Sequence, residues 1–272
     1  MYKKIYTWDA IPAERNLTVA ELRAAKGKRI LTQVTTNTVD EAKASQMAGI
    51  DMMICNYQNV EEVRQGCNKL FLTAAILLPH AVAADDMLRA AFKAMEQGAD
   101  SVMTPRSLDI VEMLAREDIP VMGHLGLIPR KSIWHGGLRA IGKTADEALT
   151  LYQKFKDLEN AGAISVEAEV IPGPVMAEIS KRTKLITVSL GSGTGADVMY
   201  LFMEDICGEN PTAPRHARAF GNIYKLKQQI KEERLNALKA FREASINKNF
   251  PADSETAGIK SEELEKFIEQ LP

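Results

Sequence analysis

Three short turns rich in small residues each join a helical stretch to a short apolar run. They read AGID (48–51), QGAD (97–100) and AGAIS (161–165). A glycine just past a helix end takes the left-handed conformation that stops the helix, and a short apolar run then suits a buried strand. Repeated units of this kind require parallel strands joined by right-handed crossovers. The chain therefore predicts an α/β fold.

The rhythm extends over most of the chain. Apolar runs predict strands at Arg29–Thr35, Asp51–Cys55, Leu70–Leu77, Ser101–Thr104, Val121–His124, Ile164–Glu169 and Ile186–Leu190. Helical periodicity predicts helices at Val39–Met47, Asp85–Gln97, Leu108–Arg116, Ala145–Asn160 and Gly173–Lys181. Seven or eight such units in about 200 residues favour a (β/α)8 TIM-type barrel over an open sheet.

The C-terminal part has a different character. A long charged helix is predicted from Ile223 to Ala244, NFPADSETAG interrupts it, and SEELEKFIEQL predicts one last short helix. We predict a single barrel domain over residues 1–272, of which 223–272 form a helical C-terminal extension.

Composition narrows the classes of partner. A formal net charge of −2 gives no basic field for nucleic acid or an anionic membrane, so a small molecule is the expected partner. Three scattered cysteines indicate free thiols in a reducing compartment. There is no signal-peptide pattern and no apolar stretch of membrane-spanning length. We expect a cytoplasmic protein.

In a parallel barrel the functional side chains project from the C-terminal ends of the strands. Glu169 ends the run ISVEAEV, and Glu167 lies two residues earlier on the same face of the strand. If that face is the lumen, desolvation and mutual repulsion raise at least one carboxyl pKa, and Glu169 can act as a general base. If the face points outward, both are solvated surface charges.

Other strand ends carry less specific signals. His124, in PVMGHLGLIPR, is either a catalytic residue or a structural hydrogen-bonding group. Arg106, in TPRSL, is either half of a surface ion pair or an anchor for a substrate carboxylate. The loop GSGTGAD (191–197) lacks the lysine of a P-loop and the spacing of a dinucleotide site, so tight turning or close backbone approach explains it better.

Several segments together carry a family resemblance. PVMGHLGLIPRKSIWHGGLRAIGK closely resembles the signature segment of ketopantoate hydroxymethyltransferases, and GAISVEAEVIP resembles that family's strand with a catalytic glutamate before a proline. ITVSLGSGTGADV and APRHARAF are also similar, and the coverage runs from about Leu31 to Pro251. The resemblance implies a barrel related to the phosphoenolpyruvate mutase and isocitrate lyase group, assembled as a homo-oligomer. It also implies hydroxymethyl transfer from methylene-tetrahydrofolate to a 2-oxo acid held by magnesium.

The departures concern the metal. Tyr57 stands opposite the family's metal-binding Asp after the second strand, and Ala75 falls at its second metal-binding Asp. Met103–Ser107 replaces a Lys-x-Glu-Gly-Gly segment. A hard dication needs several oxygen ligands. Either new ligands bind it, with Asn56, His80 and Glu167 as candidates, or fixed cations such as Arg106 stabilise an enolate instead. We favour the second option and assign no metal ligand.

The function predicted first is therefore an enzyme of this family, divergent in its site, that performs aldol or retro-aldol chemistry on a 2-oxo acid. Glu169 is assigned as the catalytic base. The assigned substrate-binding residues are Arg106, His124, Asn56, Glu167 and Thr35. Two alternatives stay open: a C–C or C–P lyase of the mutase and isocitrate lyase type, and a catalytically silent paralogue that binds a small acid.

Overall fold

The structure is a computed structural model that describes residues 2–77 and 80–272. The chain divides into two compact units, one ending at Gly221 and the other covering Asn222–Pro272. The first unit holds the barrel and is described first. Residues 78–79, which follow the predicted strand Leu70–Leu77, lie outside the described residues.

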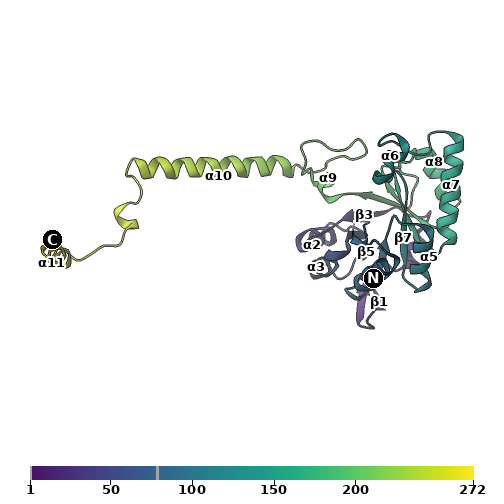
Figure 1. The fold of residues 1–272 in the computed structure, drawn as a ribbon, viewed down its shortest axis with the longest axis horizontal. Coiled ribbons are helices and arrows are strands. Elements are labelled where there is room, and N and C mark those ends of the chain that lie inside the picture. The colour runs from purple at the N-terminus through teal and green to yellow at the C-terminus, as the bar shows by residue number, and fades with distance from the viewer. Residues whose placement is uncertain (1, 78–79) are drawn as a thin grey trace. The chain divides into compact units, whose positions relative to one another are not determined.

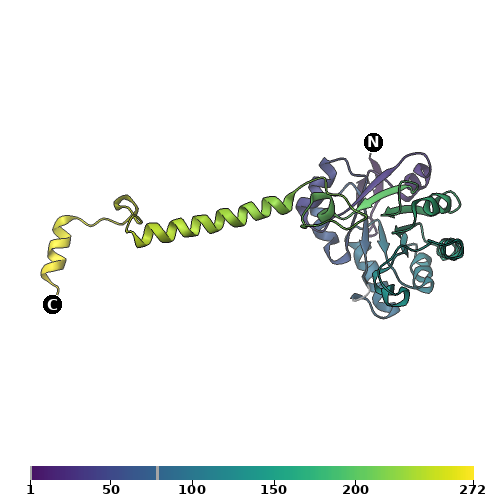
Figure 2. The same cartoon turned by 90° about the horizontal axis from the view of Figure 1, so that it is seen from above.

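Eight parallel strands close into a barrel in the order β10-β3-β4-β5-β6-β7-β8-β9, which confirms the predicted (β/α)8 architecture. Helices α2 and α3 lie on one side of the strands in Figure 1, and α5, α7 and α8 on the other. Figure 2 shows the same barrel from above. The barrel strands are β3 (Leu31–Thr35), β4 (Met52–Asn56), β5 (Phe71–Ala75), β6 (Ser101–Met103), β7 (Val121–Gly126), β8 (Ser165–Glu169), β9 (Ile186–Leu190) and β10 (Val198–Leu201).

Helices follow most strands and begin at recognisable caps. Thr18, Thr38 and Thr144 each accept a hydrogen bond from the backbone three residues on, which fixes the first turns of α1, α2 and α7. The helices of this unit are α1 (Val19–Ala25), α2 (Val39–Met47), α3 (Val60–Gly66), α4 (Ala84–Glu96), α5 (Leu108–Arg116), α6 (Ser132–His135), α7 (Ala145–Asn160), α8 (Gly173–Ser180) and α9 (Met203–Cys207), with short 3-10 turns η1 (Tyr57–Asn59) and η3 (Pro129–Lys131).

The sequence left some elements unpredicted. The eighth barrel strand, β10, follows β9 after a loop with no helix between them, so the helix–turn–strand rhythm does not mark it. An antiparallel hairpin of β1 (Lys3–Tyr6) and β2 (Pro12–Arg15) precedes the barrel. The helices α1 and α3 are each only seven residues long, too short for their periodicity to stand out.

Alternation along each strand separates two hydrophobic clusters. The lumen cluster contains Met52, Ile54, Phe71, Met122 and Val188, among others. The outer cluster packs the opposite strand faces, such as Met53, Leu72 and Val166, against buried helix residues. Since residues two apart share a face, His124, Glu167 and Glu169 belong to the lumen face together with Met122 and Ser165.

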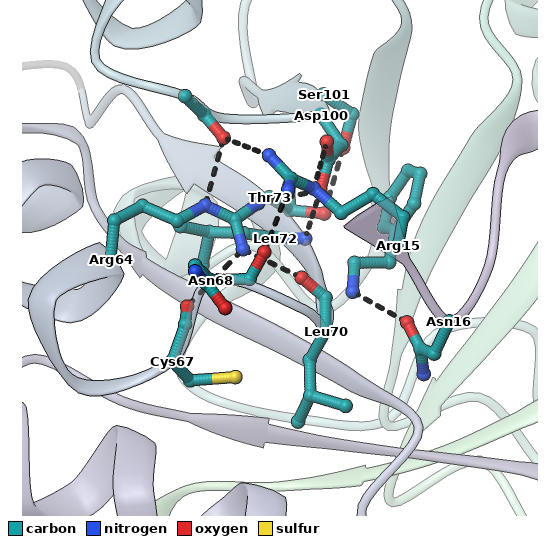
Figure 3. A network of polar contacts seen from close by, with 12 residues as sticks. Arg15, Asn16, Arg64, Cys67, Asn68, Leu70, Leu72, Thr73, Asp100 and Ser101 are labelled. Carbon is teal, nitrogen blue, oxygen red and sulfur yellow. Dashed lines mark hydrogen bonds and ion pairs between the residues drawn. The ribbon is translucent and has the colours of Figure 1, made fainter. Parts of the chain in front are cut away.

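A network of buried charges lies where strands β5 and β6 begin, at the end of the barrel opposite the mouth. Figure 3 shows this network from close by. Asp100, just before β6, accepts hydrogen bonds from Arg15 Nε at 2.8 Å and from Arg64 Nη2 at 2.6 Å. The Leu72 amide also donates to Asp100, at 2.9 Å. The three charged side chains are at most 10% exposed. Burial lowers the pKa of Arg64, against the opposing effect of the Asp100 charge. This network ties β2, α3, β5 and β6 together.

The second unit is entirely helical. It contains α10 (Ile223–Ile246), the 3-10 turn η4 (Asp253–Glu255) and α11 (Ser261–Glu269), and none of their residues is buried. The long helix extends two residues beyond the predicted end at Ala244. Among the described residues, no helix has the length and apolar character needed to span a membrane.

Candidate functional site

Three ionisable side chains from adjacent strands meet in the barrel lumen. His124 Nε2 of β7 lies 3.0 Å from Glu169 Oε2 and 3.8 Å from Glu167 Oε1, both of β8. The strand register sets this arrangement, because His124 pairs with Glu167 and Gly126 pairs with Glu169. The side chains are 5–12% exposed, so the charges lie in a strongly desolvated site. Glu167 and Glu169 therefore face the lumen, which is the condition that the sequence analysis set for Glu169 to act as a base.

The glycines around His124 explain why this strand ends as it does. A side chain at Gly123 would collide with Leu158 of α7, on the outer face of the strand. Gly126 has φ +92°, a conformation that disfavours other residues, and a side chain there would collide with the Glu169 carbonyl. The two strand ends can therefore approach until Leu127 N donates to that carbonyl at 2.7 Å. The glycines bring His124 next to Glu169.

The strand end that carries Glu169 is held from the other side as well. Ser192 Oγ donates to the Ala168 carbonyl at 2.7 Å and accepts from Ile171 N at 2.9 Å. Between these contacts Val170 has φ +49°, a left-handed conformation that is unfavourable for a β-branched residue. The glycine-rich loop thus supports the backbone next to Glu169, in agreement with the predicted close backbone approach.

The hydrogen bonds decide where the protons lie. His124 Nε2 is also 3.1 Å from the Leu127 carbonyl, which can only accept, so Nε2 carries a proton. Burial lowers the pKa of His124, but its hydrogen bond to Glu169 and the charges of both glutamates outweigh this effect, and the pKa is raised overall. Burial raises the pKa of Glu167, with Glu169 adding repulsion and His124 opposing both. The raised pKa of His124 favours a positively charged imidazole beside Glu169, and the raised pKa of Glu167 makes that carboxyl group harder to ionise. We refer to these three side chains as the charged cluster.

Several other polar groups line this lumen, and sequence analysis missed two of them. Tyr200 OH lies 2.9 Å from the Oγ1 of Thr35, a predicted substrate-binding residue, and burial raises the Tyr200 pKa well above its ordinary value. Gln33 pairs in register with Tyr200, and both polar atoms of its side chain are buried without a partner among the described residues. Glu167 Oε2 is likewise unpartnered within the described structure. Tyr200 was missed because the sequence did not predict strand β10. Gln33 could have been found, since it is a polar residue inside the apolar run of β3.

The remaining candidates lie apart from this cluster. Asn56 ends β4 and is exposed at the mouth. Arg106 does not join the carboxylates; its Nη1 and Nη2 donate to the carbonyls of Ala81 and Val82 at 2.6 and 3.0 Å. Asp197, the aspartate of the segment ITVSLGSGTGADV that resembles the family, precedes β10 at the opposite end of the barrel. There it pairs with Lys26 at 2.7 Å and accepts from Thr187, which are structural contacts.

The residues present do not fit the family's magnesium site. Ala75 places a methyl group in the lumen, and Tyr57 lies against His80 with ring centroids 6.2 Å apart. Among the described residues, only the atoms of His124, Glu167 and Glu169, within 4.8 Å of one another, could hold an ion. Magnesium prefers about six oxygen ligands, and His124 Nε2 would first have to lose the proton that Leu127 and Glu169 hold. Of the ligands suggested by sequence, Glu167 belongs to this cluster and His80 does not, while Asn56 lies exposed at the end of β4.

Comparison with solved structures concerns the fold. A phosphonopyruvate hydrolase solved with oxalate and Mg²⁺ aligns with a TM-score of 0.52 and 12% identity, over 93% of this chain and 98% of that one. A phosphoenolpyruvate phosphomutase from Streptomyces platensis subsp. rosaceus aligns with a TM-score of 0.53 and 11% identity, with the same coverage. At these identities the likeness extends to the barrel fold alone.

Comparison with known sequences identifies the family. A family model described as ketopantoate hydroxymethyltransferase matches residues 38–253. The 3-methyl-2-oxobutanoate hydroxymethyltransferase of Thermotoga maritima is 28% identical over 271 residues, covering 90% of this chain and 98% of that protein. The protein of the same name from Pyrobaculum calidifontis is 27% identical over 235 residues, covering 77% and 89%. The chain belongs to the ketopantoate hydroxymethyltransferase family.

Proposed function

We propose that this protein catalyses aldol-type transfer of a hydroxymethyl group to a 2-oxo acid through an enolate, with Glu169 as the general base. The observation that carries the proposal is the pair of His124 and Glu169 in a desolvated lumen, 3.0 Å apart at the ends of adjacent strands. Family membership supplies the reaction class. The related proteins are named for 3-methyl-2-oxobutanoate, which makes that acid the first substrate to test.

The reaction begins at the carbon next to the oxo group. Glu169 removes a proton from C3 of the 2-oxo acid, and the electron pair of the C–H bond forms the enolate. Methylene-tetrahydrofolate, the proposed donor, would supply the one-carbon unit. Water would break one methylene–nitrogen bond and add its oxygen to the methylene carbon, which leaves an N-hydroxymethyl group. C3 of the enolate would then bond to that carbon as the second methylene–nitrogen bond breaks, and the released nitrogen would take up a proton. Of the two carboxylate oxygens of Glu169, Oε2 accepts a hydrogen bond from His124, and Oε1 has no hydrogen bond to the described residues. We therefore assign Oε1 to proton removal.

Fixed charges in the lumen support this chemistry. An imidazolium at His124 is a preorganised positive charge beside the position where the enolate develops, and such a charge is strongest where water is excluded. Thr35 and Asn56 remain the proposed contacts of the substrate at the mouth. A carboxylate contact for Arg106 remains a prediction, since two of its nitrogens already hold the loop at Ala81 and Val82.

The first test is hydrogen exchange at C3 of 3-methyl-2-oxobutanoate in D2O, followed by NMR without any folate. We expect the enzyme to wash out the C3 proton, because enolate formation requires only the base and the charged cluster. The rate should be the same with a chelator as with added magnesium. Exchange that requires magnesium would contradict our metal-free assignment, and the absence of exchange with every 2-oxo acid tested would indicate a silent paralogue.

Glu167 has a distinct expected effect. Replacing Glu167 with Gln removes a negative charge that raises the pKa of His124, so the His124 pKa should fall. A His with a raised folded-state pKa contributes stability that is present below its unfolded pKa of about 6.5 and lost as the pH rises through the folded value. In the variant this loss should therefore occur at lower pH. NMR titration of the His124 ring measures the shift, with His135 and His216 as internal references; an unchanged His124 titration would contradict the assignment.

A further inference from the structure

A second polar concavity borders the site formed by His124, Glu167 and Glu169, and His124 is among its lining residues. It is a cleft of about 180 Å³ between the start of α5 and helix α7, and it reaches the strand that carries His124. One water molecule needs roughly 10–15 Å³ of such space. The cleft therefore has room for a group of several atoms.

Its charge is strongly positive. Three cations from three elements line it: Arg106 after β6, Lys131 of η3 and Lys154 of α7. The lining contains one acid, Asp157, whose Oδ1 already accepts a hydrogen bond from Gln153 at 2.8 Å. The formal sum of these three positive charges and one negative charge is +2, before any positive charge on His124, which also lines the cleft. Within the described residues, none of the three cations forms an ion pair.

Like charges are gathered here without a counter-ion. Burial lowers the pKa of Lys131, and the nearby positive charges of Lys154 and Arg130 lower it further. Burial likewise lowers the pKa of Arg130, and so does the charge of Arg106. By contrast, Lys156, also on α7, forms an ion pair with Glu159 at 3.0 Å. Three cations without an ion-pair partner among the described residues give this concavity a charge that favours an anionic ligand.

Neutral donors complete the cleft. Thr104 lines it, and its hydroxyl is buried with no partner among the residues described. Ser107 and Leu108, at the start of the nine-residue helix α5, line it too, and the Ser107 side chain does not cap that helix. The amide groups of a first helical turn attract negative charge. The hydrogen bonds from Arg106 to Ala81 and Val82 hold its guanidinium in place before any ligand arrives.

We infer that this cleft binds a phosphate group. A phosphate monoester carries about −1.5 to −2 charges at neutral pH and three strong acceptor oxygens, which match a lining of charge +2 with several donors. A carboxylate carries half that charge and fits less well. His124 lines this cleft and also contacts Glu169, but phosphate binding can be measured without turnover, so the test is separate from that of the proposed chemistry.

The test is calorimetric titration of the full chain with inorganic phosphate at pH 7.5 and low ionic strength. The wild type should bind one phosphate saturably. Lys131→Met and Lys154→Met, which keep the aliphatic stem but remove the charge, should each weaken binding by about tenfold or more. The matched control is Lys143→Met, because Lys143 is exposed and lies outside the cleft. Its affinity should equal that of the wild type.

Three results would overturn the inference: no saturable binding, equal weakening in the Lys143 control, or acetate binding as tightly as phosphate. Circular dichroism of each variant checks that a loss is not unfolding. A parallel titration with glycerol 3-phosphate distinguishes a phosphorylated organic ligand from free inorganic phosphate. Tighter binding than inorganic phosphate supports a phosphorylated organic ligand, and weaker binding supports free phosphate; both results retain the phosphate site.

Discussion

Replacing Glu169 with Gln is expected to slow C3 hydrogen exchange of the 2-oxo acid by about 10²–10⁴-fold, the usual contribution of a positioned general base. The amide has nearly the same shape but cannot take the proton. It can still accept the hydrogen bond from His124 Nε2 that Glu169 accepts at 3.0 Å, so the fold should persist. The exchange rate under saturating substrate and the thermal unfolding midpoint are the two measurements.

The control for this variant is Glu178→Gln. Glu178 lies on α8, is 56% exposed and pairs with Lys181 at 2.7 Å, so it has no access to the lumen. Its exchange rate should match the wild type. If Glu169→Gln exchanged C3 protons at the wild-type rate, another group would be the base. Glu167→Gln would then be the next variant to assay, because Glu167 is the other carboxylate of the cluster.

The barrel could be predicted because each repeating unit carries its own local signal. The glycines of AGID, QGAD and AGAIS do end helices, and Gly49, Gly98 and Gly162 all have positive φ. The predicted bounds of α2, α5, α7 and β9 are those observed. Strand β10 gave no such signal, since the loop 191–197 connects it to β9 without a helix. Closure of the sheet depends on β10 pairing with Leu31–Val34 of β3, a contact between distant segments.

The site was only partly predictable for the same reason. Alternation placed Glu167 and Glu169 on one face, but whether that face was the lumen depended on packing against helices. The contact between His124 and Glu169 depends on register across two strands, which Gly126 sets through its close approach to the Glu169 carbonyl. Arg106 shows the limit of strand-end reasoning. Its position just after a strand predicted that its side chain points into the barrel mouth. Its guanidinium instead donates hydrogen bonds to the carbonyls of Ala81 and Val82 in a neighbouring loop.

The end of the barrel opposite the mouth makes a separate prediction, about stability. Asp100 is the single carboxylate between two buried guanidiniums, Arg15 at 2.8 Å and Arg64 at 2.6 Å. Asp100→Asn should lower the free energy of unfolding by about 3–5 kcal/mol, because it leaves buried positive charges uncompensated. For a chain of this size that corresponds to a fall in Tm of roughly 6–20 °C. Asp9→Asn, at an exposed position, should leave Tm unchanged.

A second substitution distinguishes charge imbalance from lost hydrogen bonds. Arg64 Nε and Nη1 also donate to the carbonyls of Gly98 and Leu70, each at 2.8 Å, so Arg64→Met alone should destabilise the fold as well. If uncompensated charge dominates, Asp100→Asn combined with Arg64→Met should cost less than the sum of the two single changes, because one buried cation then leaves with its counter-ion. Strict additivity of the two unfolding free energies would show that the carboxylate acts through its hydrogen bonds to Arg15 and Leu72 instead.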